Sequence, residues 1–295
     1  MSKWRTREDF WVDTINYILL AVVTIMMVYP FYYILIVSFN VGSDTAAGGG
    51  MYFYPRQFTL ENYVYFLKEP KWVDAFFVSV LRTIIGTIVS VLFTCLVAYG
   101  LAQPGLMFRR TYFSIFVVAM YVSGGLIAYY VILRSIGLIN KFGVYIIPSM
   151  LSLFFLMIAV SFFREIPPEL GESARMDGAG ELKIFISLIL PLSLPLLATM
   201  GLFLGSGQWN AWLDSAYFVQ SQKLRTLSFR MIEVMNQASF RPSDAATASY
   251  SSGTAVTQFS VQVTAMIISI VPMMAVYPFL QKYFVQGMML GSVKG

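Results

Sequence analysis

The chain has 295 residues, of which 58% are hydrophobic and only 12% are charged, and its mean hydropathy is +0.70. That much apolar surface does not fit inside one water-soluble core, so a polytopic membrane protein is predicted and a soluble globular protein is excluded. The net charge of +5 is ordinary for a membrane protein, and no basic stripe with interleaved aromatic residues points to a nucleic-acid partner.

Six segments are apolar over a length that crosses a membrane, since a hydrocarbon core about 30 Å thick takes roughly 20 helical residues. Together they predict an all-α, polytopic fold, with residues 1–295 forming a single transmembrane domain. An even number of spans places both termini on the same side. The predicted spans are residues 15–39, 79–103, 111–133, 142–163, 184–206 and 259–281.

Three loops connect these spans with enough residues to carry structure of their own. Residues 40–77 and 207–258 mix Gly, Ser, Tyr and Pro with both signs of charge, so we expect folded external caps. Residues 165–183 form a shorter polar loop that is predicted to be cytoplasmic. Lys and Arg in the short flanks favour cytoplasmic termini by the positive-inside rule, although Arg134 and Lys141 on the other side keep that bias modest.

Residues that carry chemistry are few. The sequence has no histidine and one cysteine, Cys95, in the middle of the second span. His-dependent triads, His-Glu-x-x-His zinc sites and disulfides within the chain are therefore excluded. No Gly-x-x-x-x-Gly-Lys-Ser/Thr loop is present, so ATP, if it is used, binds to a partner. We expect no catalytic residue, metal site or bound cofactor on this chain.

The loop at residues 165–183 has the start and stop signals of a short helix. Pro167-Pro168 fits only the first turn of a helix, and Gly178 is typical of its end. Leu170 and Ala174 are four residues apart and share one face. Two interpretations stay open from the spacing: a helix that docks into a partner, or a solvated turn between two spans.

This loop resembles the cytosolic Glu-Ala-Ala loop of ABC importer permeases, in which a glycine and an Ile-x-Leu-Pro ending follow. The resemblance rests on Glu172, Ala174, Gly178 and Leu190-Pro191. In that family the loop docks onto the ATPase, so the resemblance implies a coupling helix. Its residues would be Glu169, Leu170, Glu172, Ser173, Ala174, Asp177 and Gly178.

Further segments extend the resemblance over nearly the whole chain, toward carbohydrate importers of the MalG type and, within it, LplC-like oligo- and polysaccharide permeases. The departures are Ser173 and Leu188, where Ala and Ile are usual, and Val78, where Asn is usual at the head of the second helix. The similar segments are Leu81–Thr87, Ala98–Ala102, Gly137–Asn140, Gly207–Asp214 and Tyr277–Gly295.

The resemblance implies a type I ABC importer permease fold and half of a translocation pore in a bacterial plasma or inner membrane. Its partners would be a second, homologous permease subunit, two ATP-binding subunits that carry ATP and Mg, and a solute-binding protein outside. The substrate would be an oligosaccharide, and membrane lipid would surround the bundle.

A path for sugar needs aromatic faces and side chains that hydrogen-bond hydroxyls. The candidates are Arg82, Tyr121, Tyr129, Tyr130, Asn140, Trp209, Asn210, Trp212 and Asp214. For Trp209 and Trp212 an interfacial aromatic belt is the alternative. Arg82 either extends to the lipid headgroups or faces the pore, where it would favour an anionic sugar such as a uronic-acid oligomer.

Two other classes of function are compared with the permease. An ion-coupled secondary transporter usually keeps ionisable groups at mid-membrane, and the charge-free runs contain none there. A membrane-embedded enzyme needs a convergent set of nucleophile, base or metal ligands, which the sequence does not provide. Pro191 and Pro195 are predicted to bend the fifth span, as part of the coupling or as ordinary membrane-helix kinks.

Overall fold

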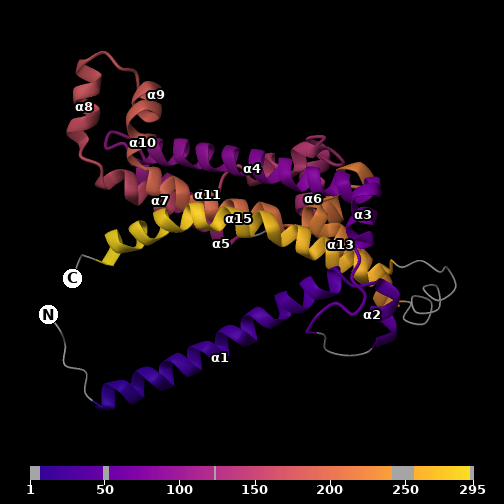
Figure 1. The fold of residues 1–295 in the computed structure, drawn as a ribbon. Coiled ribbons are helices and arrows are strands. Elements are labelled where there is room, and N and C mark those ends of the chain that lie inside the picture. Colours follow the sequence, from indigo (N-terminus) through magenta and orange to yellow (C-terminus); the bar gives the residue numbers. More distant parts are fainter. Residues whose placement is uncertain (1–6, 49–52, 123, 241–255, 293–295) are drawn as a thin grey trace. The chain divides into compact units, whose positions relative to one another are not determined.

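A computed structural model describes residues 7–48, 53–122, 124–240 and 256–292. The chain is helical within these ranges and forms no strand there, apart from an antiparallel bridge between Asn40 and Phe58. It divides into two compact units, residues 1–69 with 231–270 and residues 70–230 with 271–295. Each unit is described by itself (Figure 1).

The first unit contains the 32-residue helix α1 (Arg7–Ser38), which continues through Pro30, followed by α2 (Gly42–Gly48) and α3 (Glu61–Lys68). Two buried asparagines fold the segment after α1. Asn40 donates from Nδ2 to Asp44 Oδ2 and Thr45 Oγ1, both at 2.8 Å. Asn62 donates to the carbonyls of Ser38 and Asn40 at 3.0 and 2.9 Å. These bonds satisfy buried backbone groups, so the first part of the predicted loop 40–77 is folded.

The core of the second unit lies where α4 (Pro70–Ala102) packs against both α7 (Leu153–Glu165) and α11 (Leu194–Asn210) (Figure 1). Cys95, Ala98 and Ala159 are completely buried there, and such small side chains let the helices approach closely. Cys95 is therefore a packing residue, as its position in the sequence predicts.

The remaining helices of the two units are short, apart from the last. They are α5 (Arg109–Tyr121), α6 (Gly125–Ser135), α8 (Pro168–Met176), α9 (Glu181–Ile184), α10 (Leu190–Leu192), α12 (Leu213–Phe218), α13 (Leu227–Phe240) and α15 (Gln258–Ser292). Short 3-10 turns occupy Phe142–Tyr145, Ile147–Ser149 and Gln222–Leu224, and a π-helical turn occupies Phe185–Ile189.

Three described helices are long and apolar enough to cross a membrane, within Phe10–Ser38, Pro70–Ala102 and Gln258–Val276. Three bent helix pairs raise this number to six if each pair is one span. The second helix begins at Pro70, earlier than the predicted start at residue 79, because proline fits a first turn. The all-α, polytopic fold class is thus confirmed, with three of the predicted spans interrupted.

The interruptions have local causes. The predicted span 142–163 bends by 44° between the 3-10 turn ending at Ser149 and α7, next to Pro148. The predicted span 184–206 bends by 82° between Leu192 and Leu194. There a π-helical turn precedes Pro191, and Pro195 follows in the first turn of α11, so backbone hydrogen bonds are lost on both sides. The predicted bend at the two prolines is confirmed.

Candidate functional site

Helix α8 begins and ends where its sequence predicts. Pro167 is the N-cap and Pro168 the first helical residue. At the other end, Gly178 takes a φ of +79° and Ala179 donates its backbone N–H to the carbonyl of Ala174 at 2.9 Å. This is the left-handed glycine ending that closes many helices. The result is an isolated rod of nine residues at one end of the second unit, beyond the end of α4 (Figure 1).

Most residues of α8 are exposed, and two are half-buried. Gly171 and Ala174 are half-buried, and Ala174 packs against the core of the second unit. The other predicted coupling residues are exposed: Glu169, Leu170, Glu172, Ser173, Asp177 and Gly178. Met176, which the sequence reasoning missed, is 88% exposed. With Leu170, which is 41% exposed, it gives this polar loop two apolar side chains that are open to solvent.

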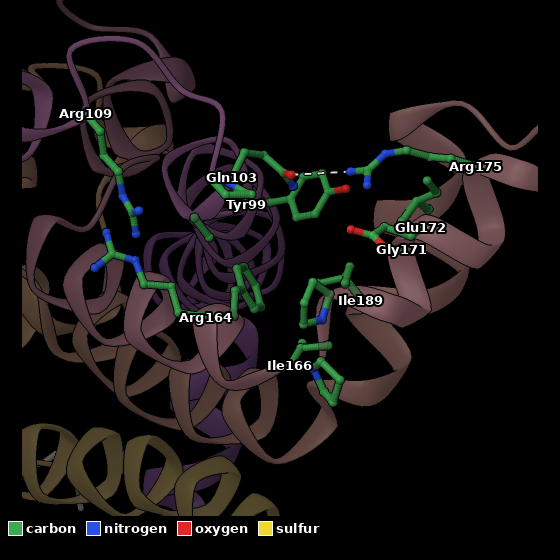
Figure 2. A pocket seen from close by; sticks show the side chains of 15 residues that line it. Tyr99, Gln103, Arg109, Arg164, Ile166, Gly171, Glu172, Arg175 and Ile189 are labelled. Atoms are coloured by element: carbon green, nitrogen blue, oxygen red, sulfur yellow. Dashed lines mark hydrogen bonds between the residues drawn. The ribbon is translucent and has the colours of Figure 1, made fainter.

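An ionic bridge ties α8 to its neighbours. Arg175 Nε donates to Glu181 Oε1 at 2.7 Å, and a second nitrogen donates to Gln103 Oε1 at 3.4 Å (Figure 2). Tyr99 Oη donates to the other oxygen of Glu181 at 2.7 Å. The hydrogen bond to Glu181, and next its charge, raise the pKa of Arg175. The bridge sets the position of α8 relative to the end of α4.

A cavity of about 410 Å³ lies between α8 and the ends of the helices it adjoins. Its walls come from α4, α5, α7, α8 and the π-helical turn, and it carries three arginines, Arg109, Arg164 and Arg175. In Figure 2, Arg175 and Glu172 lie on the α8 side, and Arg109 and Arg164 point toward each other on the opposite side. The cavity is therefore polar at both ends.

A second polar cluster is built around Arg82, in a part of α4 far in sequence from the coupling loop. The side chain of Arg82 is 3% exposed and pairs with Asp214. Its Nε donates to Gln208 Oε1 at 2.8 Å, and another nitrogen donates to the carbonyl of Ala211 at 3.1 Å. The guanidinium also lies 4.6 Å from the centre of the Tyr145 ring. We call these five residues the Arg82 network.

Gln208 links α4, α11 and the 3-10 turn that ends at Ser149. Its Nε2 donates to Ser149 Oγ at 2.7 Å while its Oε1 accepts from Arg82. Gly86 lies one turn beyond Arg82, and a Cβ added there would be 2.9 Å from Gln208 Cδ. The glycine is thus required for the close approach of α4 and α11.

The expectation that Arg82 extends to the lipid headgroups is wrong, because its partners lie inside the protein. The condition for an anionic preference, a free arginine facing the pore, is not met either, since Asp214 neutralises the charge. Local sequence reasoning missed Gln208 and Tyr145, which lie far from Arg82 along the chain. The one signal for this pairing was the cost of an arginine inside an apolar run.

The tryptophans predicted near the end of the fifth span have different surroundings. Trp209 is 4% exposed and packs edge-to-face on Phe76, with ring centres 6.3 Å apart. A ring buried this deeply offers no face to a sugar or to lipid, so both interpretations are wrong for Trp209. Trp212 is 36% exposed. Asn210 is exposed and donates to the carbonyl of Ser206 at 2.9 Å.

Two of the tyrosines predicted for the sugar path in the third span pack against another aromatic ring. Tyr129 and Tyr130 both lie against Phe218, with ring centres at 5.4 and 6.2 Å, while Tyr121 is 79% exposed at the end of α5. Asn140 has a φ of +58°, and its Oδ1 accepts the backbone N–H groups of Gln220 and Ser221. Its side-chain oxygen therefore has a structural role that spacing did not reveal.

No family model matches the chain. Among curated proteins, it is 33% identical to "Protein LplC" of Bacillus subtilis (strain 168) over 284 residues, which cover 96% of this chain and 95% of the relative. It is 31% identical to the "Polygalacturonan/rhamnogalacturonan transport system permease protein YtcP" of the same organism, covering 96% and 98% of the two chains. It is 27% identical to an arabinooligosaccharide transport permease, AraQ, of Halalkalibacterium halodurans, covering 97% and 96%.

The chain belongs to the family of ABC carbohydrate-importer permeases. Its fold matches a chain of a bacterial ABC transporter involved in the import of the acidic polysaccharide alginate, with a TM-score of 0.85, 25% identity and coverage of 96% and 100%. A second match, at 15% identity and a TM-score of 0.58, is a bacterial alginate ABC transporter in complex with an alginate pentasaccharide-bound periplasmic protein. The match at 15% identity supports the fold alone.

Membership of this permease family decides between the classes of function compared above. The chain is a permease subunit of an oligosaccharide importer and a multi-pass membrane protein, and its relatives are transport proteins rather than enzymes. The ion-coupled carrier is therefore the wrong alternative. Within the described residues, no three His, Cys, Asp or Glu side chains gather as metal ligands would.

Proposed function

We propose that this permease couples to a separate ATPase through α8. The observation that carries the proposal is that most side chains of α8, carboxylates and apolar ones alike, are exposed, while Ala174 packs against the core of the second unit and anchors the helix. A helix with this surface fits a cleft in a partner, with Glu172 and Asp177 accepting from basic or backbone donors. Leu170 and Met176 would supply the buried apolar contacts.

In the proposed assembly, the permease forms part of the pore and separate subunits bind ATP. A second, homologous permease subunit completes the pore, and two ATP-binding subunits carry ATP and Mg, with no cofactor on the permease itself. A solute-binding protein delivers the oligosaccharide from outside. Both termini and α8 lie in the cytoplasm in this arrangement, as the basic flanks Arg109-Arg110 and Lys183 favour.

Closure of the ATPases on ATP would draw the two coupling helices together and tilt the permease bundles. The bridge from Arg175 to Glu181, and the packing of Ala174, transmit this displacement to the start of the fifth span. The chemistry of ATP hydrolysis belongs to the partner. The helix bundle of the permease would alternate between two conformations, one open to each side of the membrane.

The test is ATP hydrolysis by the complete importer reconstituted with its binding protein. We expect Glu172→Lys and Gly178→Asp each to reduce substrate-stimulated hydrolysis by about tenfold or more, because each disturbs the docking surface. Glu61→Lys makes the same charge change on the exposed first turn of α3 and serves as the control. Full coupling in both α8 variants would sink the assignment.

The charge of the substrate is a separate part of the proposal. Names of relatives refer to polygalacturonan and to alginate, so we propose an acidic oligosaccharide. The neutralised Arg82 does not by itself support a preference for acid. Import of uronic-acid and neutral oligomers of equal length decides the point, since equal rates would remove the preference for acid and leave the permease function intact.

A further inference from the structure

The cavity beside α8 has a basic wall that the proposed coupling does not use. Arg109 and Arg164 both line it, and Figure 2 shows their guanidinium groups pointing toward each other. Arg109 is half-buried, and Arg164 lies 5.9 Å from the centre of the Phe113 ring. Two like charges held together in this way repel each other unless an anion lies between them.

The protein itself provides no such anion in the part of the chain that the structure describes. Neither Arg109 nor Arg164 has a carboxylate within ion-pair distance there, whereas Arg82 and Arg175 are each paired. The one carboxylate in the cavity wall, Glu172, interacts with Arg175 on the far side. The positive charges of Arg109 and Arg164 are therefore not compensated by a carboxylate of the described residues.

The position of these arginines indicates which anion they meet. Arg109 is the first residue of α5 and Arg164 lies in the last turn of α7, so both sit at the ends of candidate membrane spans. The ends of such spans lie at the depth of the lipid headgroups, and arginines are common there. The adjoining wall contains Phe163 and Ile166, which suit the glycerol and upper acyl part of a lipid.

We propose that Arg109 and Arg164 bind the phosphate of an anionic phospholipid. Guanidinium groups match phosphate oxygens with paired, charge-assisted hydrogen bonds, and two of them surround one phosphate from opposite sides. Phosphatidylglycerol has no cation in its headgroup, so its phosphate reduces the uncompensated charge of the two arginines. Phosphatidylcholine is zwitterionic, and its ammonium group would be repelled by them. The lipid would fill the space between α5, α7 and α8 and lie directly behind the coupling helix.

The test measures lipid binding to the purified full-length chain by native mass spectrometry, with phosphatidylglycerol, phosphatidylcholine and inorganic phosphate as separate probes. We expect one phosphatidylglycerol to bind more tightly than phosphatidylcholine. Arg109→Gln combined with Arg164→Gln should weaken that binding by about tenfold or more, down to the level of phosphatidylcholine. The control, Arg110→Gln with Arg134→Gln, removes the same charge outside the cavity and should bind as the wild type does.

Three results would overturn the proposal. Equal loss in the control pair would mean a nonspecific effect of charge, and equal binding of the two lipids would remove the anionic preference. Displacement of the lipid by inorganic phosphate at matched concentration would assign the same arginines to a free phosphate instead. If the double variant does not fold, Arg109→Gln alone replaces it, and unchanged lipid affinity in that variant equally contradicts the proposal.

Discussion

The loop that carries α8 and the Arg82 network both concentrate polar side chains in this apolar chain, and they use them in opposite ways. On α8 the carboxylates of Glu169 and Glu172 are exposed, although Glu172 interacts with Arg175 at the cavity wall, and the apolar Met176 is 88% exposed. Around Arg82 the polar side chains form hydrogen bonds and an ion pair with one another, and the side chain of Arg82 is 3% exposed. One region has its partners within the chain, and the other is the surface on which we propose that the ATPase docks.

The difference teaches how to interpret a charged residue in a membrane protein. A buried charge with internal partners contributes to the fold, and its loss is felt as lost stability. An exposed charge on a firmly anchored rod contributes little to stability, and its loss is felt when a partner docks. Variants of the two regions should therefore differ in how much stability they lose, and the largest loss is expected for the buried charge pair.

Asp214→Ala should have the largest effect, because it leaves the Arg82 guanidinium buried without its anion. We expect the free energy of unfolding in detergent to fall by about 3 kcal/mol, the low end for breaking a buried pair, since the Asp214 side chain is 33% exposed. Asp177→Ala on the coupling loop is the matched control and should change it by less than about 0.5 kcal/mol. Similar losses in both variants would erase the contrast between the two regions.

Gly86→Ala should be next in size. The added Cβ would lie 2.9 Å from Gln208 Cδ, and Gln208 is held at both ends by Arg82 and Ser149, so it moves only by breaking the network. We expect a loss of about 2 kcal/mol in the same unfolding measurement. Gly100→Ala, on the same helix with open space around it, should be neutral or stabilising. A harmless Gly86→Ala would show that α4 and α11 do not need this contact.

Gly178→Ala probes the end of α8. Nothing lies within 4 Å of the added Cβ, so the expected loss of about 1 kcal/mol comes from the left-handed backbone alone, at φ +79°. Gly180→Ala, at an ordinary φ of −74° with open space around it, is the control and should be close to neutral. Equal melting temperatures for the two variants would contradict the assigned helix ending.

The bridge between Arg175 and Glu181 should have the smallest effect on stability, because its side chains are 42% and 56% exposed. We expect Arg175→Gln to lower the melting temperature less than Gly178→Ala does. The difference in melting temperature between Arg175→Gln and the wild type should vanish at about 1 M salt, because salt screens an exposed ion pair. The raised pKa of Arg175 means that stability from this pair is lost at strongly alkaline pH. The hydrogen bond from Arg175 also lowers the pKa of Glu181, so the same stability is lost at the other end of the scale, as the pH falls through that lowered value. A salt-independent loss would mean that the bridge is not screened as its exposure implies.

Sequence reasoning succeeded where the determinants are local. Pro168 and Gly178 fix the ends of α8 within one segment, and the two prolines of the fifth span bend it, so both features could be predicted. It failed where the determinants are distant. The partner of Arg82 lies 132 residues away along the chain, and nothing in the neighbouring residues announces that pairing. The burial of Trp209 and the structural role of Asn140 likewise depend on tertiary contacts.

The substrate path, the single-domain assignment and the cytoplasmic orientation of the termini stay predictions. The C-terminal similarity includes 293–295, which lie outside the described residues. The exposed aromatic candidates, Tyr121, Tyr129 and Trp212, are the ones to substitute first when sugar contacts are sought.

The bend of 82° at Ser193 gives the fifth span the geometry of a crank. Its short arm, Glu181–Leu192, starts at the ionic bridge to α8, and its long arm, α11, runs beside α4 to the Arg82 network. Because the arms are nearly perpendicular, a pull on α8 along the short arm would displace the long arm sideways. In the coupling that we propose, this sideways displacement of α11 would move one wall of the pore.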